Sequence, residues 1–393
     1  MSTRRKLAWI ALLYFAEGFP FGLVADNLPV YFRAHGVSLA AIGMLSVLGL
    51  PWSFKVLWAP LVDRFGSHRR WITGALVVMA LATLAIPLAD PVAPSAFLWA
   101  VLACLTVASA TQDIAIDAYT IGLVNPGEEG VANGVRVSAY RAALIAGGGG
   151  LVVLAGRVGW TPLFWVAAAI LAALAAAAWR TPAVTVARQP AAAWARAFLA
   201  WLARPGAPFV LLFVLLYKLG DASMGPMVKP FWLDRGLSVE EIGFVSTTLG
   251  VAASVAGALA GGVATSRIGI FRALWALGAL QALSNLGYAA AAAAGAGRPA
   301  IYAASFVESF TGGLGTAAFL AFLMHVCERE QAATQYALLS ALFGLTRSLA
   351  GAASGFAATG LGYPAYFALT FVLALPAYAL LPWVRRWIHD RPQ

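Results

Sequence analysis

The chain has 393 residues, of which 61% are hydrophobic and only 11% are charged. With a mean hydropathy of +0.81, this composition excludes an ordinary soluble domain and is typical of a polytopic membrane protein. The net charge of +10 does not indicate a nucleic-acid surface, because the basic residues gather on alternate loops, as described below.

Apolar runs long enough to cross a bilayer follow one another along the whole chain, separated by short polar or Pro/Gly-rich breaks. They predict twelve transmembrane helices near residues 7–31, 40–60, 71–89, 95–124, 131–155, 162–179, 207–232, 238–264, 271–294, 299–326, 334–358 and 363–384. The first run is not a cleavable signal peptide, because Glu17, Pro20 and Asp26 interrupt it and no small-residue cleavage site follows. We expect it to remain as a bent first helix.

The distribution of Lys and Arg predicts the orientation. If the N-terminus is inside, sixteen of them lie on cytoplasmic segments, and the outer loops hold four: Arg33, Arg157, Arg235 and Arg298. By the positive-inside rule, both termini are then cytoplasmic. The basic charge therefore reflects topology and contact with anionic membrane lipids, and we expect no nucleic-acid partner.

The cytoplasmic loop after the second run reads APLVDRFGSHRR over residues 59–70. It resembles the Gly-x-x-x-Asp-Arg-x-Gly signature of the major facilitator superfamily, with Ala59 in place of the first glycine. An acid at a helix end beside cations and a glycine that permits a tight turn are the physical elements of this loop. We expect a cytoplasmic gate formed by Asp63, Arg64, Gly66, Arg69 and Arg70.

The stretch from Ser109 to Gly130 places Asp113 and Asp117 in an otherwise apolar run. Four residues along a helix return to the same face, so both carboxylates should face one cavity. A carboxylate in hydrocarbon is costly and marks a pathway for ions or polar solutes. Together with Glu17 they are candidates for proton coupling, because burial disfavours the charged form of a carboxyl.

A structural ion-pair network is the alternative for these acids. Segments four and five form a hairpin, which places Arg141 at nearly the depth of Asp113 and Arg136 nearer to Asp117. The planar guanidinium of Arg141 also suits an anionic group of a substrate, and the two roles do not exclude each other.

In the second half, Lys218 and Asp221 lie three residues apart in segment seven and can neutralise each other. Glu308, the acid of segment ten, is expected to face Lys218 or Arg347, whereas Glu17 has Lys218 as an alternative partner. Lys55, Lys229 and Asp26 lie near segment ends and are interpreted as snorkelling or solvated. The complete set of candidate proton-coupling or substrate residues is Glu17, Gln112, Asp113, Asp117, Tyr140, Arg141, Lys218, Asp221 and Glu308. For the polar residues, interhelical packing is the alternative.

The two halves of the chain repeat. HGVSLAAIG (35–43) returns as RGLSVEEIG (235–243), and APLVDRFG (59–66) returns as GVATSRIG (262–269). These echoes predict two pseudo-symmetric six-helix bundles, 1–180 and 207–393, with the substrate site midway between them. The cytoplasmic linker over 181–206 has apolar residues at helical spacing and is compatible with a short interfacial helix.

Four stretches resemble the AmpG-like branch of the superfamily, the peptide/acetyl-coenzyme A transporter family. They are ATQDIAIDAY (110–119), SAYR (138–141), LYKLGD (216–221) and TQYALLSAL (334–342). The resemblance implies an all-α major facilitator fold and proton-driven import of anhydromuramoyl peptides through a bacterial inner membrane. Thr120, where relatives often have a basic residue, and the end of the chain after twelve segments depart from the family pattern. A siderophore or another bulky polar solute is the alternative cargo.

Other classes of protein have less support in the sequence. A membrane enzyme needs a nucleophile–base set, and no such constellation of His, Ser or Cys is present. There is no P-loop for ATP-driven pumping, and neither the cysteines nor the histidines form a metal set, so we expect no cofactor and no metal. A sensor that binds its ligand without accumulating it is a further alternative. The sequence does not predict the oligomeric state.

Overall fold

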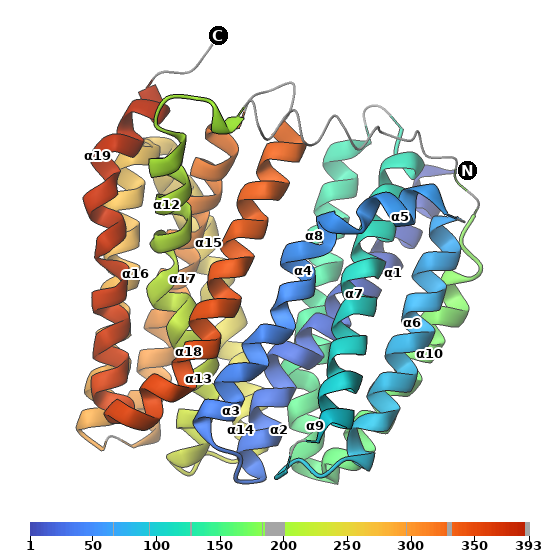
Figure 1. The fold of residues 1–393 in the computed structure, drawn as a ribbon, viewed down its shortest axis with the longest axis horizontal. Coiled ribbons are helices and arrows are strands. Elements are labelled where there is room, and N and C mark those ends of the chain that lie inside the picture. The colour runs from blue at the N-terminus through green and yellow to red at the C-terminus, as the bar shows by residue number, and fades with distance from the viewer. Residues whose placement is uncertain are drawn as a thin grey trace. The chain divides into compact units, whose positions relative to one another are not determined.

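The computed structural model describes residues 1–65, 67–93, 95–125, 128–182, 184, 201–295, 297–327 and 332–389. Throughout these residues the chain forms α-helices joined by short 3₁₀ and π-helical turns, and they contain no strand. Figure 1 labels the helices along the chain. The predicted all-helical class is confirmed.

The helices of the first half of the sequence follow the predicted spans. They are α1 Thr3–Gly22, α2 Leu28–Ala34, α3 Leu39–Met44, α4 Leu50–Phe54, α5 Ala59–Arg64, α6 His68–Ala85, α7 Ala96–Leu123, α8 Glu129–Ile145, α9 Leu151–Val158 and α10 Trp160–Ala178. A π-helical turn over Leu23–Asn27 joins α1 to α2, and another over Ala146–Gly150 joins α8 to α9. The first span is therefore distorted within its length, as the polar and proline positions predict.

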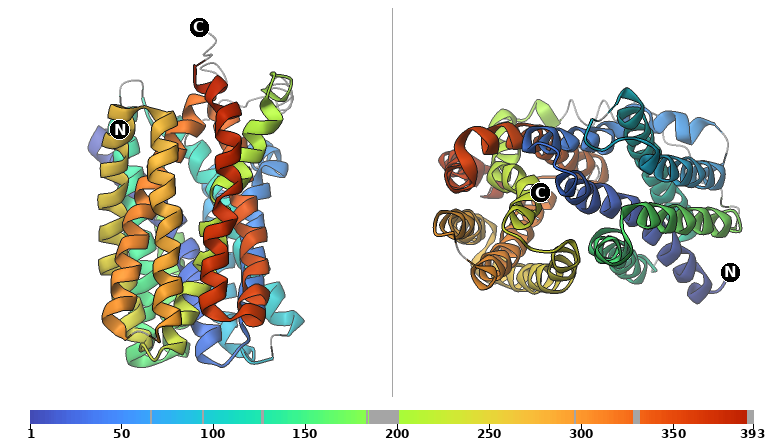
Figure 2. Two further views of the ribbon diagram at one scale, coloured as in Figure 1. Left: turned by 90° about the vertical axis from the view of Figure 1, so that its left-hand side faces the viewer. Right: turned by 90° about the horizontal axis from the view of Figure 1, so that it is seen from below.

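The helices of the second half also follow the predicted spans. They are α12 Ala207–Tyr217, α13 Leu219–Asp234, α14 Val239–Val245, α15 Val251–Ile268, α16 Ile270–Ala293, α17 Arg298–His325, α18 Ala332–Ala374 and α19 Pro376–His389. In the end-on view of Figure 2, the helices coloured yellow to red run nearly parallel to one another. Phe213, Phe319 and Phe322 are fully buried among them and lie at the centre of an apolar core.

Ten helical runs in the described part of the chain are long and apolar enough to cross a membrane. One of them, Leu338–Trp387, contains the last two predicted spans, which separate at Gly362, where φ is +72°. The ten do not include α16, which covers the predicted span 271–294. The described helices therefore account for all twelve predicted spans.

The chain divides into two compact units. Unit 1 comprises Met1–Val37, Phe54–Gln189 and Ser238–Phe244, and unit 2 comprises Ser38–Ser53, Pro190–Leu237 and Val245–Gln393. Each unit thus contains a short segment from the other half of the sequence. The linker expected over 181–206 falls largely on residues 183 and 185–200, which lie outside the described residues. Its interfacial helix and the domain boundary stay predictions.

The two copies of the sequence repeat around residues 35–43 and 235–243 fold into the same turn. Gly36 and Gly236 both have φ of +80°, a conformation that side chains with a Cβ rarely adopt. Two residues later, Ser38 and Ser238 cap the next helix, each accepting from the backbone N–H three residues ahead, at 3.3 and 3.1 Å. The repeat detected in the sequence is therefore also a repeat of local structure.

Glycine allows the backbones of unit 1 to touch where α1 meets the turn after α8. A Cβ added to Gly147 would lie 2.4 Å from the carbonyl oxygen of Phe19. The side-chain amide of Asn27 fixes the same crossing by donating to the carbonyls of Gly147, at 2.7 Å, and Gly148, at 3.2 Å. Gly147 therefore permits the close approach of these helices, since its missing Cβ leaves room for the neighbouring backbone.

Helices α15 and α17 of unit 2 cross at equally short range. A Cβ added to Gly313 would lie 2.3 Å from the carbonyl oxygen of Ser254, and one added to Gly257 would collide with the carbonyl oxygen of Phe310. Since both obstacles are backbone atoms, they cannot move aside without separating the helices.

We predict that Gly313→Val lowers the free energy of unfolding by about 1–3 kcal/mol, because overpacking a helix crossing forces the backbones apart. Gly262→Val is the matched control, since a Cβ at Gly262 of α15 meets nothing within 4 Å. Thermal unfolding of the purified proteins in detergent measures the difference. Equal melting temperatures for the two variants would contradict this account of the crossing.

Candidate functional site

A cluster of ionisable side chains lies within the membrane-spanning part of unit 1. We call it the acid–base cluster. Its members are Tyr14 and Glu17 of α1, Lys55 of the 3₁₀ turn Lys55–Leu57, Asp113 and Asp117 of α7, and Arg136 of α8. Four separate elements therefore contribute to it.

The geometry of α7 brings the two aspartates to the same side. The helix is continuous from Ala96 to Leu123, so residues four apart share a face, as the spacing predicts. Lys55 donates to Asp113 at 3.1 Å. Asp117 accepts from the hydroxyl of Tyr14 at 2.7 Å and pairs with Arg136 at 3.0 Å. Each aspartate thus has its own cation.

Glu17 is the most deeply placed acid of the cluster. It is 7% exposed, and its Oε2 atom has no hydrogen-bond partner among the described residues. It lies within hydrogen-bonding reach of Asp113 and close to Asp117, Lys55 and Arg136. A hydrogen bond between two carboxyl groups requires a proton on one of them. Glu17 is therefore placed to share a proton with Asp113.

The charges of the acid–base cluster do not balance. Glu17, Asp113 and Asp117 carry three negative charges when ionised, against two positive charges on Lys55 and Arg136. An uncompensated charge in a low-dielectric surrounding is strongly unfavourable. Addition of one proton makes the cluster neutral, and its loss leaves one negative charge.

The expected pairing of Asp113 with Arg141 is wrong. Asp113 pairs with Lys55, and Arg141 is exposed. The reason is helical geometry: Arg136 and Arg141 are five residues apart on α8, which places them about 140° apart around the helix axis. Since Arg136 faces Asp117, Arg141 faces elsewhere. The snorkelling interpretation of Lys55 is also wrong, because its ammonium group lies on Asp113.

A second polar cluster lies within unit 2. We call it the Lys218 cluster, and its members are Lys218, Asp221, Gln281, Glu308 and Thr316. The ammonium group of Lys218 donates to Asp221 at 3.2 Å, to Gln281 at 2.7 Å and to Thr316 at 2.9 Å. Lys218 is only 3% exposed, so these three acceptors replace its water shell. The expected pairing with Asp221 is present.

Local backbone features allow the Lys218 cluster to form. Lys218 lies at the break between α12 and α13, where φ is −104° and ψ is 10°. Gln281 also donates to Asp221, and a Cβ at Gly315 would collide with its side-chain oxygen. Glu308 lies near Lys218 and Asp221, one of the two alternatives expected for it, and accepts from the neighbouring Ser309 hydroxyl at 3.3 Å.

Sequence reasoning missed Gln281 and Thr316. The one signal for Gln281 is its amide side chain in the apolar run 271–294. A single sequence does not show which of the several polar residues in such runs contact a buried charge. Of the other candidates, Gln112 is fully buried and its amide atoms have no hydrogen-bond partner among the described residues. Tyr140 is partly buried on α8, where its carbonyl oxygen lies against Gly18.

The gate residues proposed between the second and third spans are only partly described. Gly66 and the side chain of Asp63 lie outside the described residues. Arg64 is exposed over the ring of Phe65, and Arg70 is exposed at the start of α6. Arg69 donates to the carbonyl of Thr181 at 3.3 Å and stacks on Trp179. The function of this loop as a gate stays a prediction.

Nowhere in the described chain do three or more His, Cys, Asp or Glu side chains gather to hold a metal.

Outside the spans, Glu128 ties the loop before α8 to the start of α1. Its carboxylate accepts from Lys6 at 2.7 Å, from Thr3 at 2.7 Å and from the backbone N–H of Asn125 at 3.0 Å. The hydrogen bond from Lys6 and those from Asn125 and Thr3 lower the pKa of Glu128 to about 2.

In the unfolded chain a glutamate has a pKa of about 4.3. Because the pKa of Glu128 is lower in the folded protein, its ionised carboxylate stabilises the folded state at pH values above about 4.3, and this contribution is lost as the pH falls towards 2. We therefore predict that Glu128→Gln lowers the melting temperature at pH 6 and above, and that the difference from the parent protein shrinks below pH 4.5. Melting curves from pH 3 to pH 8 in detergent measure it. A difference that stays constant down to pH 3 would contradict the assignment.

Twelve helical spans, two units and buried, hydrogen-bonded charges inside the spans define the class: a multi-pass membrane transport protein. The comparisons with known proteins agree. The model of the family described as Major Facilitator Superfamily matches residues 10–220. The chain is 33% identical over 388 residues to the anhydromuropeptide permease of Escherichia coli K12, covering 96% of this chain and 79% of that protein. The chain therefore belongs to the Major Facilitator Superfamily, in its AmpG-like branch.

Solved structures show the same fold. A bacterial homolog of the human lysosomal transporter Spinster, in an inward-facing and occupied conformation, aligns with a TM-score of 0.78 at 15% identity, covering 99% of this chain and 97% of that one. The nucleoside transporter NupG aligns with a TM-score of 0.76 at 16% identity over the full length of both chains. Its membership of the AmpG-like branch identifies the protein as a secondary transporter of the inner membrane with a small-molecule substrate, and not as an enzyme.

Proposed function

We propose that this protein imports muropeptides, that is anhydromuramoyl peptides, by alternating access, using the proton gradient across the inner membrane. The support for the cargo is the 33% identity to a protein named anhydromuropeptide permease. The main support for proton coupling is the charge imbalance of the acid–base cluster, in which three carboxyl groups face two cations.

The coupling we propose runs through Glu17 and Asp113. With one shared proton the acid–base cluster is neutral, and a neutral cluster is less costly to enclose when the transporter closes around the solute. When the proton leaves, the extra negative charge favours the state in which water reaches the cluster. Asp117 has a different role in this scheme: it is 36% exposed and holds Tyr14 and Arg136 in place.

For the solute, we propose that Arg141 binds a carboxylate of the peptide. Its guanidinium is exposed on α8, in the same helix as Arg136, and no partner among the described residues occupies it. A planar guanidinium binds a carboxylate through two parallel hydrogen bonds. Lys218 is less suited to this task, because three protein acceptors already satisfy it.

We also propose that both termini face the cytoplasm and that anionic lipids border the basic loops. The excess of Lys and Arg on the segments at that side supports this orientation. Import is then movement towards the side on which the chain begins and ends.

Uptake into proteoliposomes with an imposed inward proton gradient tests the proposal. Labelled anhydromuropeptide should accumulate, and a proton ionophore should abolish the accumulation. A ferric siderophore under the same conditions should not accumulate. Uptake of the siderophore instead would assign the alternative cargo, and binding of muropeptide without accumulation would identify a sensor; either result would overturn the proposal.

A further inference from the structure

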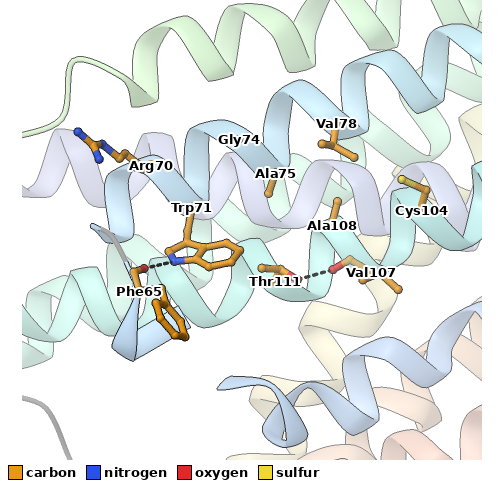
Figure 3. A pocket seen from close by; sticks show the side chains of 10 residues that line it. All are labelled: Phe65, Arg70, Trp71, Gly74, Ala75, Val78, Cys104, Val107, Ala108 and Thr111. Carbon is orange, nitrogen blue, oxygen red and sulfur yellow. Dashed lines mark hydrogen bonds between the residues drawn. The ribbon is translucent and has the colours of Figure 1, made fainter. Parts of the chain in front are cut away.

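A pocket of about 580 Å³ lies between α6 and α7 of unit 1. Its lining residues are Phe65, Arg70, Trp71, Gly74, Ala75, Val78, Cys104, Val107, Ala108 and Thr111. Figure 3 shows Arg70 at one end of the pocket and Cys104 with Val78 at the other. The volume is in the range of about 300–1,000 Å³ that small-molecule sites occupy.

The interior of this pocket offers almost no free polar atom. The indole N–H of Trp71 donates to the carbonyl of Phe65 at 2.6 Å, and the hydroxyl of Thr111 donates to the carbonyl of Val107 at 2.7 Å (Figure 3). The other lining side chains are apolar apart from Arg70 and the thiol of Cys104. A ligand of this pocket must therefore be a long apolar group with few hydrogen-bonding needs.

The charge at one end of the pocket is positive. Arg70 is exposed, and no acid among the described side chains pairs with it. The guanidinium of Arg64 lies over the ring of Phe65 at 5.7 Å, which adds a second positive charge at the same end. Arginine is suited to the planar, bidentate recognition of phosphate oxygens.

Because α6 and α7 are membrane-spanning, their open apolar faces are covered by lipid rather than by water. Val77, Val78, Leu81 and Val107 are all exposed on these two helices. Basic pockets between transmembrane helices bind anionic head groups. We propose that the α6–α7 pocket binds one acyl chain of an anionic phospholipid, with its phosphate on Arg70.

Thermal unfolding in a mild detergent tests the site, with phosphatidylglycerol or phosphatidylethanolamine added as the probe. Phosphatidylglycerol should raise the melting temperature in a concentration-dependent way, as any ligand that binds the folded state does. Gly74→Leu should remove most of this shift, because a Cβ at Gly74 meets nothing within 4 Å and the side chain extends into the pocket. Gly262→Leu is the control for the gain in helix propensity, since Gly262 is also an open helical position.

Labelling of Cys104 gives an independent reading of occupancy, because this cysteine is free, exposed and part of the lining. In a Cys327→Ser background, phosphatidylglycerol should slow the reaction of Cys104 with a maleimide several-fold. Arg70→Gln should abolish this protection, whereas Arg180→Gln, at another exposed arginine of unit 1, should retain it.

Three outcomes would overturn the proposal. Equal melting shifts with phosphatidylethanolamine would mean that the head group is not recognised. A full phosphatidylglycerol shift in Gly74→Leu would place the lipid elsewhere. Unchanged labelling of Cys104 would show that no acyl chain enters the pocket.

Discussion

Glu17→Gln is expected to reduce proton-driven uptake by roughly tenfold or more while leaving solute binding intact. A glutamine keeps the size of the side chain but cannot release a proton, and a tenfold effect needs only about 1.4 kcal/mol. Glu17 is buried next to Asp113 of α7. It is the one acidic residue of α1, so no other side chain of this helix can replace it. The measurement is uptake of labelled muropeptide under an imposed gradient, beside exchange of the same solute with the gradient collapsed.

Exchange provides the control for folding and binding. If Glu17 carries the proton, Glu17→Gln should lose accumulation but retain exchange, because exchange returns the carrier without net proton movement. Asp117→Asn is the matched variant, since this carboxylate is more exposed, accepts a hydrogen bond from Tyr14 and pairs with Arg136. It should lose less accumulation than Glu17→Gln. Gradient-driven accumulation at the parental level in Glu17→Gln would remove Glu17 from the scheme.

Lys218→Met is expected to destabilise unit 2 by about 3–5 kcal/mol, the usual cost of removing one partner from a buried ion pair. The variant leaves Asp221 and the oxygen of Gln281 without their shared donor. The double variant Lys218→Met with Asp221→Leu removes both charges of the pair and should recover most of the lost stability, because Asp221 is then no longer buried without its cation. Chemical unfolding of the parent, of the single variants Lys218→Met and Asp221→Leu, and of the double variant in detergent completes the cycle.

The same variants separate a structural from a transport role of the Lys218 cluster. A structural pair predicts that the double variant regains both stability and uptake. A role in the transport cycle predicts regained stability with uptake still absent, and this is the result we expect, because Glu308 loses Lys218 as its neighbouring cation. A Lys218→Met protein as stable as its parent would contradict the ion pair altogether.

Most of the fold could be predicted from the sequence, because span length and apolar composition are set by the thickness of the bilayer. The turns at Gly36 and Gly236 were readable from the repeat, since glycine and serine at these positions have local structural reasons. The break at Gly362 inside one long apolar run was placed correctly between the last two spans. These features depend on residues that are near each other in the chain.

The partners of buried charges were harder to predict, because they depend on the rotation of each helix about its axis. Asp113 and Asp117 were found by their spacing alone, but Lys55 was assigned to the membrane interface, and Arg141 was given the place that Lys55 occupies. In the same way, Gln281 and Thr316 accept hydrogen bonds from Lys218, although no sequence pattern distinguishes them from other polar residues. A single sequence indicates the lengths of the helices but not the rotation of each helix about its axis.

In the proposed mechanism, the carboxyl groups of the acid–base cluster carry the proton that drives solute movement. Its most direct test is the proton uptake that accompanies muropeptide entry into proteoliposomes, measured with an internal pH-sensitive dye. We expect proton entry with solute in the parent protein and none in the triple variant Glu17→Gln, Asp113→Asn, Asp117→Asn. Proton-coupled accumulation that survives in the triple variant would contradict it.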